Sequence, residues 1–94
     1  MNAADLLTAA AGLVSGDRAK QHGDMRLNHQ NIATMWNAYL KIRREPAAPL
    51  TAVDVAHMES LLKVARTQSG EDNDDDLVDG AAYLGVASQV GDDQ

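Results

Sequence analysis

Apolar residues recur at helical spacing in four stretches of the chain, and no stretch alternates in the manner of a strand. The pattern predicts helices over residues 3–15, 28–44, 52–68 and 75–90. Residues 16–27 have glycines near both ends and no sustained period, which is typical of a loop. The sequence therefore predicts an all-α protein.

Local signals mark the ends of these helices. Asn28 is a good N-cap residue for the second helix, and Pro46 disfavours helical backbone just before it. Thr51 followed by Asp54 resembles a capping box at the start of the third helix. The fourth helix begins with Asp74, Asp75 and Asp76, whose charges suit the positive end of the helix dipole.

The apolar stripes predict how the helices pack. A domain of 94 residues hides only about 60–65% of the surface of its unfolded chain, so further burial by association would stabilise it. We expect a compact bundle of about four helices in a single domain, completed by homo-oligomerisation. The expected core positions are Leu6, Ala10, Leu13 and Val14, then Ile32, Met35, Trp36, Tyr39, Leu40 and Arg43, then Val55, Met58, Leu62 and Ala65.

Charge is divided unevenly along the chain. Residues 1–66 hold all eight basic residues against six acidic ones, a charge of +2, whereas residues 67–94 hold eight acidic residues and no basic one, a charge of −8. The first part can attract phosphates while the second repels them. With three aromatic residues in all, Trp36, Tyr39 and Tyr83, a small anionic ligand is favoured over extended nucleic acid.

The composition also bears on the cellular compartment. The chain has no cysteine, so a disulfide framework and a thiolate metal site are both excluded. Its apolar runs are too short to cross a bilayer, and it lacks the pattern of a signal peptide. We therefore expect a cytoplasmic protein with no membrane partner.

Two basic clusters are candidates for binding an anion. Glu59, Lys63 and Arg66 share one face of the third helix. They can form an exposed ion pair of about 0.3–0.5 kcal/mol, or Lys63 and Arg66 can hold a phosphate. The second cluster lies in the predicted loop over residues 16–27, which is either an anion clamp or a solvated connection. Its candidate residues are Arg18, Lys20, His22 and Arg26.

The fourth helix carries a third cluster. Asp76, Asp79, Gly80 and Tyr83 fall within an arc of about 100° at 100° per residue. Asp76 suits a helix start, and Tyr83 can stack on a base or fill a gap in the core. Gly80 costs about 1 kcal/mol inside a helix, which indicates that another backbone or a ligand comes close.

These residues support two resemblances. The run from Asp76 to Leu84 resembles the last metal-binding helix of MazG-like all-α nucleotide pyrophosphohydrolases. Most of the chain resembles a family of small, largely uncharacterised helical proteins encoded by phages and prophages. The positions that carry this second resemblance are Gly16-Asp-Arg18, His22-Gly23-Asp24, Asn28, Trp36, Asp54, Lys63-Val-Ala-Arg66 and Asp76 to Tyr83.

The chain departs from the hydrolase pattern at the metal site. MazG-like enzymes hold Mg²⁺ between a Glu-x-x-Glu pair and the later acids, and this chain has no such pair. The substitutes, Asp54 and Glu59, are five residues apart and poorly aligned. The resemblance still allows one Mg²⁺ held by Asp76 and Asp79. The three histidines have no short metal-ligand spacing, so they do not add a metal site.

Three hypotheses remain. The resemblance to phage proteins implies a homo-oligomer of the bacterial host cytoplasm. It would sequester a small nucleotide, such as a cyclic nucleotide immune signal, between subunits without a cofactor and so counteract anti-phage defence. The alternatives are a Mg²⁺-dependent MazG-like hydrolase, with Asp76 and Asp79 as metal ligands, and a structural or partner-binding helical module. The expected ligand-binding residues are Arg18, Lys20, His22, Arg26, Trp36, Lys63, Arg66, Asp79 and Tyr83.

Overall fold

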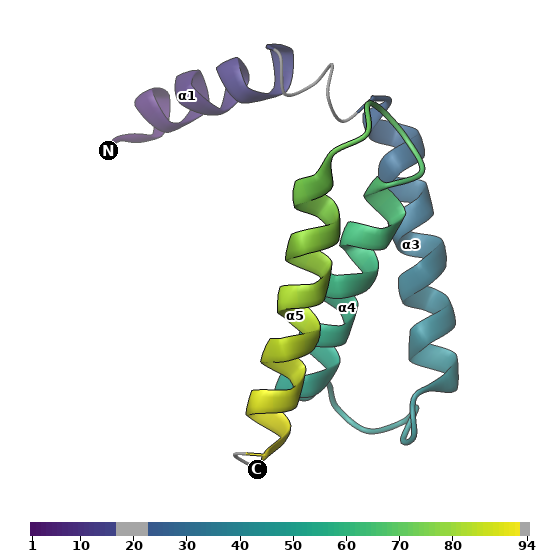
Figure 1. Ribbon diagram of the computed structural model, residues 1–94. Helices are drawn as coiled ribbons and strands as arrows, with labels where there is room; N and C mark the ends of the chain where they lie inside the picture. Colours follow the sequence, from purple (N-terminus) through teal and green to yellow (C-terminus); the bar gives the residue numbers. More distant parts are fainter. Residues whose placement is uncertain (17–22, 93–94) are drawn as a thin grey trace.

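The computed structural model describes residues 1–16 and 23–92. These residues form four helices and no strand, so the expected all-α class is confirmed (Figure 1). The helices are α1 (Ala3–Ser15), α3 (Met25–Ile42), α4 (Ala52–Arg66) and α5 (Asp74–Asp92).

The start of α3 differs from the prediction because a better cap lies upstream. Asp24 is the N-cap, and its carboxylate accepts hydrogen bonds from the backbone N–H groups of Arg26 at 2.8 Å and Leu27 at 3.2 Å. The helix therefore begins three residues earlier than expected, and Asn28 is a buried residue within it. The prediction of Asn28 as the cap is wrong, because the Asp24 carboxylate already accepts from the first turn.

The start of α4 confirms the predicted capping box. The Thr51 hydroxyl accepts from the backbone N–H of Asp54 at 3.2 Å, and the Asp54 carboxylate accepts from the backbone N–H of Thr51 at 2.9 Å. The helix ends at Arg66, two residues before the predicted end. Three aspartates lie in the first turn of α5, where the helix dipole stabilises negative charge.

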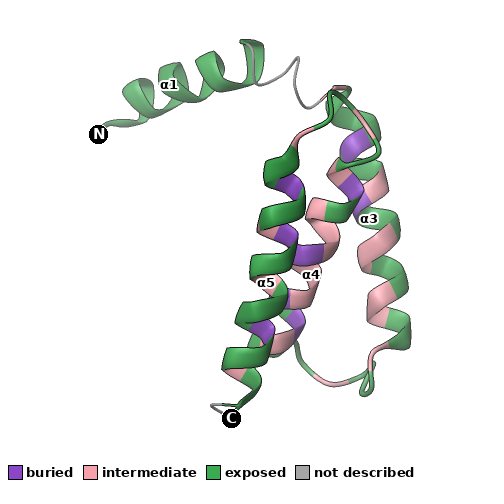
Figure 2. Cartoon of the chain, viewed as in Figure 1, coloured by how far each residue is buried: buried purple, intermediate pink, exposed green. Residues whose placement is uncertain are grey.

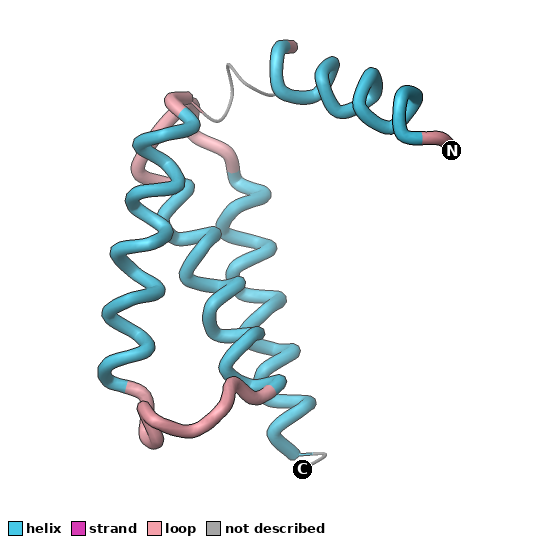
Figure 3. The backbone as a smooth tube through the Cα atoms, turned by 180° about the vertical axis from the view of Figure 1, so that it is seen from behind, coloured by secondary structure: helices cyan, strands magenta, loops and turns pink. Residues whose placement is uncertain are grey.

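Helix α4 is the central element, because it contacts both α3 and α5 (Figures 1 and 3). The indole Nε1 of Trp36 on α3 donates to the carbonyl oxygen of Met58 on α4 at 2.7 Å. On the other side of α4, the Ser60 hydroxyl donates to the carbonyl oxygen of Gly80 on α5 at 2.9 Å. Hydrogen bonds to backbone carbonyls thus fix the position of α4 against both neighbours.

Two glycine loops meet at one end of the three helices. Gly23, just before α3, and Gly70, between α4 and α5, have φ angles of 73° and 71°. A Cβ atom placed on Gly23 would lie 2.7 Å from the backbone nitrogen of Gly70. Only glycine fits this approach without strain, and the contact ties the start of α3 to the α4–α5 turn.

The buried positions lie on α3, α4 and α5 (Figure 2), and the apolar residues among them have mostly small side chains. Helices that present small residues to one another can approach closely, but they hide little apolar area. Many large apolar residues of the described chain are more than half exposed as a result. The buried apolar residues are Ile32, Ala56, Ala65 and Ala87.

Helix α1 lies apart from the other three and has no buried residue (Figures 1 and 2). The radius of gyration is 15.6 Å, whereas a compact chain of this length would have about 12 Å. The predicted compact four-helix bundle is therefore correct for α3, α4 and α5 and wrong for α1 within one chain. An apolar stripe shows that a helix needs a partner, but it does not show where that partner is.

Candidate functional site

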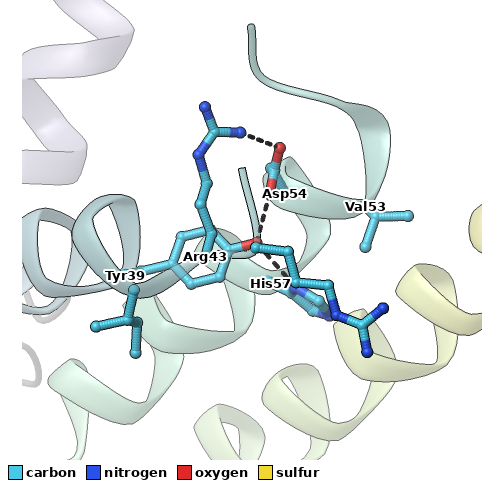
Figure 4. A pocket seen from close by; sticks show the side chains of 7 residues that line it. Tyr39, Arg43, Val53, Asp54 and His57 are labelled. Carbon is cyan, nitrogen blue, oxygen red and sulfur yellow. Dashed lines mark hydrogen bonds and ion pairs between the residues drawn. The ribbon is translucent and has the colours of Figure 1, made fainter. Parts of the chain in front are cut away.

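A pocket of about 510 Å³ lies where α3 leads into α4 (Figure 4). Helical spacing builds it, because Tyr39 on α3 lies one turn before Arg43, the C-cap residue of α3, and Asp54 and His57 are about one turn apart on α4. Its surface is mostly apolar with a few polar groups, which is typical of small-molecule sites. The lining residues are Tyr39, Ile42, Arg43, Arg44, Val53, Asp54 and His57.

Asp54 is the centre of the polar contacts in this pocket. Its carboxylate accepts from the Tyr39 hydroxyl at 2.6 Å and from Nη1 of Arg43 at 2.7 Å (Figure 4). It also accepts from the backbone N–H and the hydroxyl of Thr51. The hydrogen bond from Tyr39 is the largest cause that lowers the pKa of Asp54 from 3.8 to about 2, followed by the backbone N–H of Thr51. Asp54 is therefore a fixed negative charge at neutral pH.

Tyr39 connects Asp54 to His57. Burial is the largest cause that raises the pKa of Tyr39 from 10.0 to about 12, and the hydrogen bond to Asp54 and the charge of that carboxylate also contribute. Because the single hydroxyl proton goes to Asp54, the Tyr39 oxygen accepts from Nδ1 of His57 at 3.0 Å. This assignment places the histidine proton on Nδ1 and leaves Nε2 for another partner.

Arg43 holds the segment between α3 and α4 through hydrogen bonds to its backbone. Its guanidinium donates to the carbonyl oxygens of Pro46 at 3.2 Å and Pro49 at 3.4 Å, and also to that of Ala48. The side chain is 8% exposed, and it neutralises Asp54. Arg44, which is exposed, adds a second guanidinium, so the lining carries two positive charges against one negative charge in a chain of net charge −6.

The charged residues predicted on the last two helices lie together between α4 and α5. Nζ of Lys63 lies 3.0 Å from Oδ2 of Asp79, and Nε of Arg66 lies 3.6 Å from Oδ1 of Asp76. A hydrogen bond with Glu59 on α4 raises the pKa of Tyr83. The charges along this helix pair thus contact one another, and binding of a phosphate here stays a prediction.

Gly80 lies inside α5 at a point where α4 comes close. A Cβ atom there would lie 3.5 Å from Cβ of Lys63 and 3.8 Å from the carbonyl oxygen of Ser60. Gly80 itself is buried. The approaching group that the sequence predicted is the α4 helix.

The acidic residues predicted as magnesium ligands lie beside basic side chains, and binding of Mg²⁺ by them stays a prediction. Asp76 and Asp79 are paired with Arg66 and Lys63, so a metal ion that needs hard oxygen ligands would have to displace both cations. Asp54 is occupied by the donors of the pocket. Among residues 1–16 and 23–92, no three His, Cys, Asp or Glu side chains are grouped as a metal would require.

Two further predicted ligand residues, Trp36 and Arg26, are both described on α3. Trp36 is half-buried against α4 and uses its N–H in the bond to Met58, and Arg26 is exposed in the first turn of α3. Neither lines the pocket. Arg18, Lys20 and His22 lie outside the described residues.

The residues that line the pocket were not predicted as a site from the sequence. One signal was present, because Arg43 occupies a position in the otherwise apolar stripe of the predicted helix over residues 28–44. A charge there requires a buried partner, and Asp54 and His57 supply polar groups one turn apart on the next helix. The sequence assigned Asp54 only to a helix cap or to a substitute metal ligand.

Comparison with known proteins places the chain in a family. Residues 5–91 match a domain of unknown function, DUF6378. The chain belongs to this family. A relative, the Gene 55 protein of Mycobacterium phage L5, is 39% identical over 85 residues, which are 90% of this chain and 51% of the relative. The Gene 55 protein of Mycobacterium phage D29 is 29% identical over 85 residues, which are 90% of this chain and 52% of that relative.

The relatives of this DUF6378 chain are longer proteins. The chain spans about half the length of the curated phage proteins that it matches, and their names state no activity. No solved structure matches the chain. Within the described part of the chain, no helix is long and apolar enough to cross a membrane. The expected membership in a phage protein family of unknown function is confirmed, and the resemblance to MazG-like enzymes is not shown.

Proposed function

We propose that the protein binds a small phosphate-bearing ligand of the nucleotide class in the α3–α4 pocket and sequesters it without chemical turnover. The observation that carries this proposal is the pocket itself, with a volume of about 510 Å³ and a positive lining in an acidic chain. Ligand pockets commonly measure about 300–1,000 Å³ and combine apolar walls with a few placed polar groups. A nucleotide presents the same combination, an apolar base beside a charged phosphate.

Each part of the pocket has a role in this proposal. Ile42 and Val53 supply apolar wall for the base. Arg44 supplies a planar two-pronged donor that matches phosphate geometry, and Nε2 of His57 supplies a second polar contact. Tyr39 holds the His57 ring through the bond at Nδ1, so this group is oriented before the ligand arrives.

The relatives give this binding a biological setting. Both curated relatives are phage proteins, and a phage gains from removing nucleotide signals that its host uses in defence. A cyclic nucleotide signal is the ligand that we propose first. Capture without turnover suits this task, because one bound signal per site is silenced for as long as it stays bound.

The test is a binding titration of the full chain by isothermal calorimetry with AMP, ATP, a cyclic mononucleotide and a cyclic dinucleotide. We expect at least one of these nucleotides to bind and to be recovered intact after heating. Arg44→Ala should weaken binding about tenfold or more, because a hydrogen bond to a charged group contributes about 1.5–3 kcal/mol. Arg26→Ala is the matched control, since Arg26 is an exposed arginine of α3 outside the pocket lining.

Three outcomes would overturn the proposal. None of the four nucleotides binds, or Arg44→Ala and Arg26→Ala weaken binding equally, or the bound nucleotide is recovered as hydrolysis products. Binding that disappears in a Lys63→Ala/Arg66→Ala variant while Arg44→Ala binds normally would move the site to the α4–α5 cluster. Release of pyrophosphate that is lost in Asp79→Asn would instead support the hydrolase hypothesis.

One observation favours the third hypothesis, a module that binds a protein partner. Helix α1 has no buried residue although it carries an apolar stripe. A surface of this kind is typical of a helix that packs against another molecule.

A further inference from the structure

An apolar groove of about 210 Å³ runs between α4 and α5. Leu77 and Leu84 on α5 are 64% and 55% exposed, and Val64 on α4 is 47% exposed. An exposed apolar groove of this kind marks a docking surface for another element. The lining residues are Ser60, Val64, Thr67, Asp76, Leu77, Gly80, Ala81 and Leu84.

Helix α1 offers an apolar stripe of the same length. Leu6 and Leu13 are seven residues apart, as are Leu77 and Leu84 in the groove. At a rise of 1.5 Å per residue, each pair spans about 10 Å along its helix. The α1 stripe also includes Leu7 and Val14, and Leu6, Leu7, Leu13 and Val14 are all more than half exposed.

Charge does not oppose contact between the stripe and the groove. Asp5, in the first turn, is the single charged residue of α1. The one charged residue that lines the groove is Asp76, which is already paired with Arg66. Docking would therefore remove little unpaired charge from water, which keeps the desolvation cost low.

We propose that α1 of one copy lies in the α4–α5 groove of a second copy, and that the two copies exchange α1 reciprocally. The single chain carries α1 away from its own bundle (Figure 1). In a reciprocal exchange each copy contributes at most the 13 residues of α1 and the 8 that line its groove, 21 in all. A stable interface needs about 20–30 residues a side. Reciprocal exchange approaches this number because each copy contributes both α1 and a groove, whereas α1 folded back on its own chain leaves no interface between copies.

The first experiment measures the mass of the full chain in solution by light scattering after size exclusion. We expect a dimer. Leu13→Asp in the stripe and Leu77→Asp in the groove should each give a monomer with unchanged helical circular dichroism, because both side chains are exposed in the single chain. Leu50→Asp is the control, since Leu50 is 51% exposed but lies outside α1 and the groove, and it should stay dimeric.

The second experiment identifies which copy supplies α1. The chain has no cysteine, so single cysteines report specific contacts. Ala10 and Ala81 lie in the middle of their stripes, so they can meet whichever way α1 runs. Mixing equal amounts of Ala10→Cys and Ala81→Cys chains under oxidation should give the mixed disulfide dimer far above the twofold excess over each like pair that random pairing would give.

Two results would overturn the exchange. One is a wild-type monomer whose Ala10→Cys/Ala81→Cys double variant forms an intrachain disulfide, which would show α1 folded back on its own chain. The other is a dimer whose mass survives both Leu13→Asp and Leu77→Asp, which would place the interface elsewhere.

Discussion

Substituting Gly23 by alanine should destabilise the bundle through the loop contact. The φ angle of 73° is a left-handed conformation that costs an L-residue about 1–2 kcal/mol. The new Cβ would also lie 2.7 Å from the nitrogen and 2.9 Å from Cα of Gly70, well inside the contact distance of about 3.5–4.0 Å. Both contacted atoms are backbone, so the two loops must separate. We expect a total loss of about 2–3 kcal/mol.

Urea unfolding followed by far-UV circular dichroism, at one fixed protein concentration, measures this loss. Gly85→Ala is the matched control, because Gly85 lies within α5 and a Cβ there would meet nothing within 4 Å. It should stabilise the protein by up to about 1 kcal/mol through helix propensity. If Gly23→Ala leaves the free energy of unfolding unchanged, or raises it as Gly85→Ala does, the contact between the two loops does not contribute to the fold.

Four further predictions concern the polar contacts. The folded pKa of Asp54, about 2, lies below its ordinary 3.8, so its contribution to stability is present above pH 3.8 and is lost as the pH falls towards 2. Asp54→Asn should flatten the acid unfolding profile in that window, and an unchanged profile would contradict this. The pKa of Tyr39 is raised from 10.0 to about 12, so its contribution is present below pH 10 and is lost as the pH rises to 12, and tyrosinate absorbance should rise correspondingly late. Trp36→Phe should cost about 1 kcal/mol in urea unfolding, because the Met58 carbonyl oxygen on α4 loses the hydrogen bond from the indole N–H. A Lys63→Ala, Asp79→Ala double-mutant cycle should give a coupling below about 1 kcal/mol, because the Asp79 side chain is 48% exposed, and a larger value would indicate a pair removed from water.

The helices could be predicted from the sequence because their signals are local. The capping box of Thr51 and Asp54 and the period of the apolar stripes depend on residues within one or two turns. The predicted start of α3 was wrong because Asp24 and Asn28 are both good caps, and propensity alone does not choose between them. The position of α1 could not be predicted, because an apolar stripe indicates that a helix is buried against a partner but does not indicate which surface that partner is.

The candidate pocket depends on contacts that sequence spacing does not encode. Tyr39 and Asp54 are fifteen residues apart and on different helices, and their hydrogen bond exists only because the connection brings α3 back against α4. The pairing of Lys63 with Asp79, by contrast, follows from two helical faces that both carry charge. The sequence pattern indicated the Lys63–Asp79 cluster and did not indicate the pocket. The reason is that Arg43 was assigned to the apolar stripe of the predicted helix over residues 28–44 and not to a site.

The small side chains at the helix contacts have a consequence for mutational tolerance. In most proteins the damaging substitutions of a core are truncations, which leave a void. Ala56, Ala65, Ala87 and Gly80 have almost nothing to truncate, so a saturation library at these four sites should show the reverse asymmetry. Variants would be lost in order of added volume, as each larger side chain pushes α4 away from its neighbours. The spacing of these helices, more than the filling of space between them, is what selection on this chain would have to preserve.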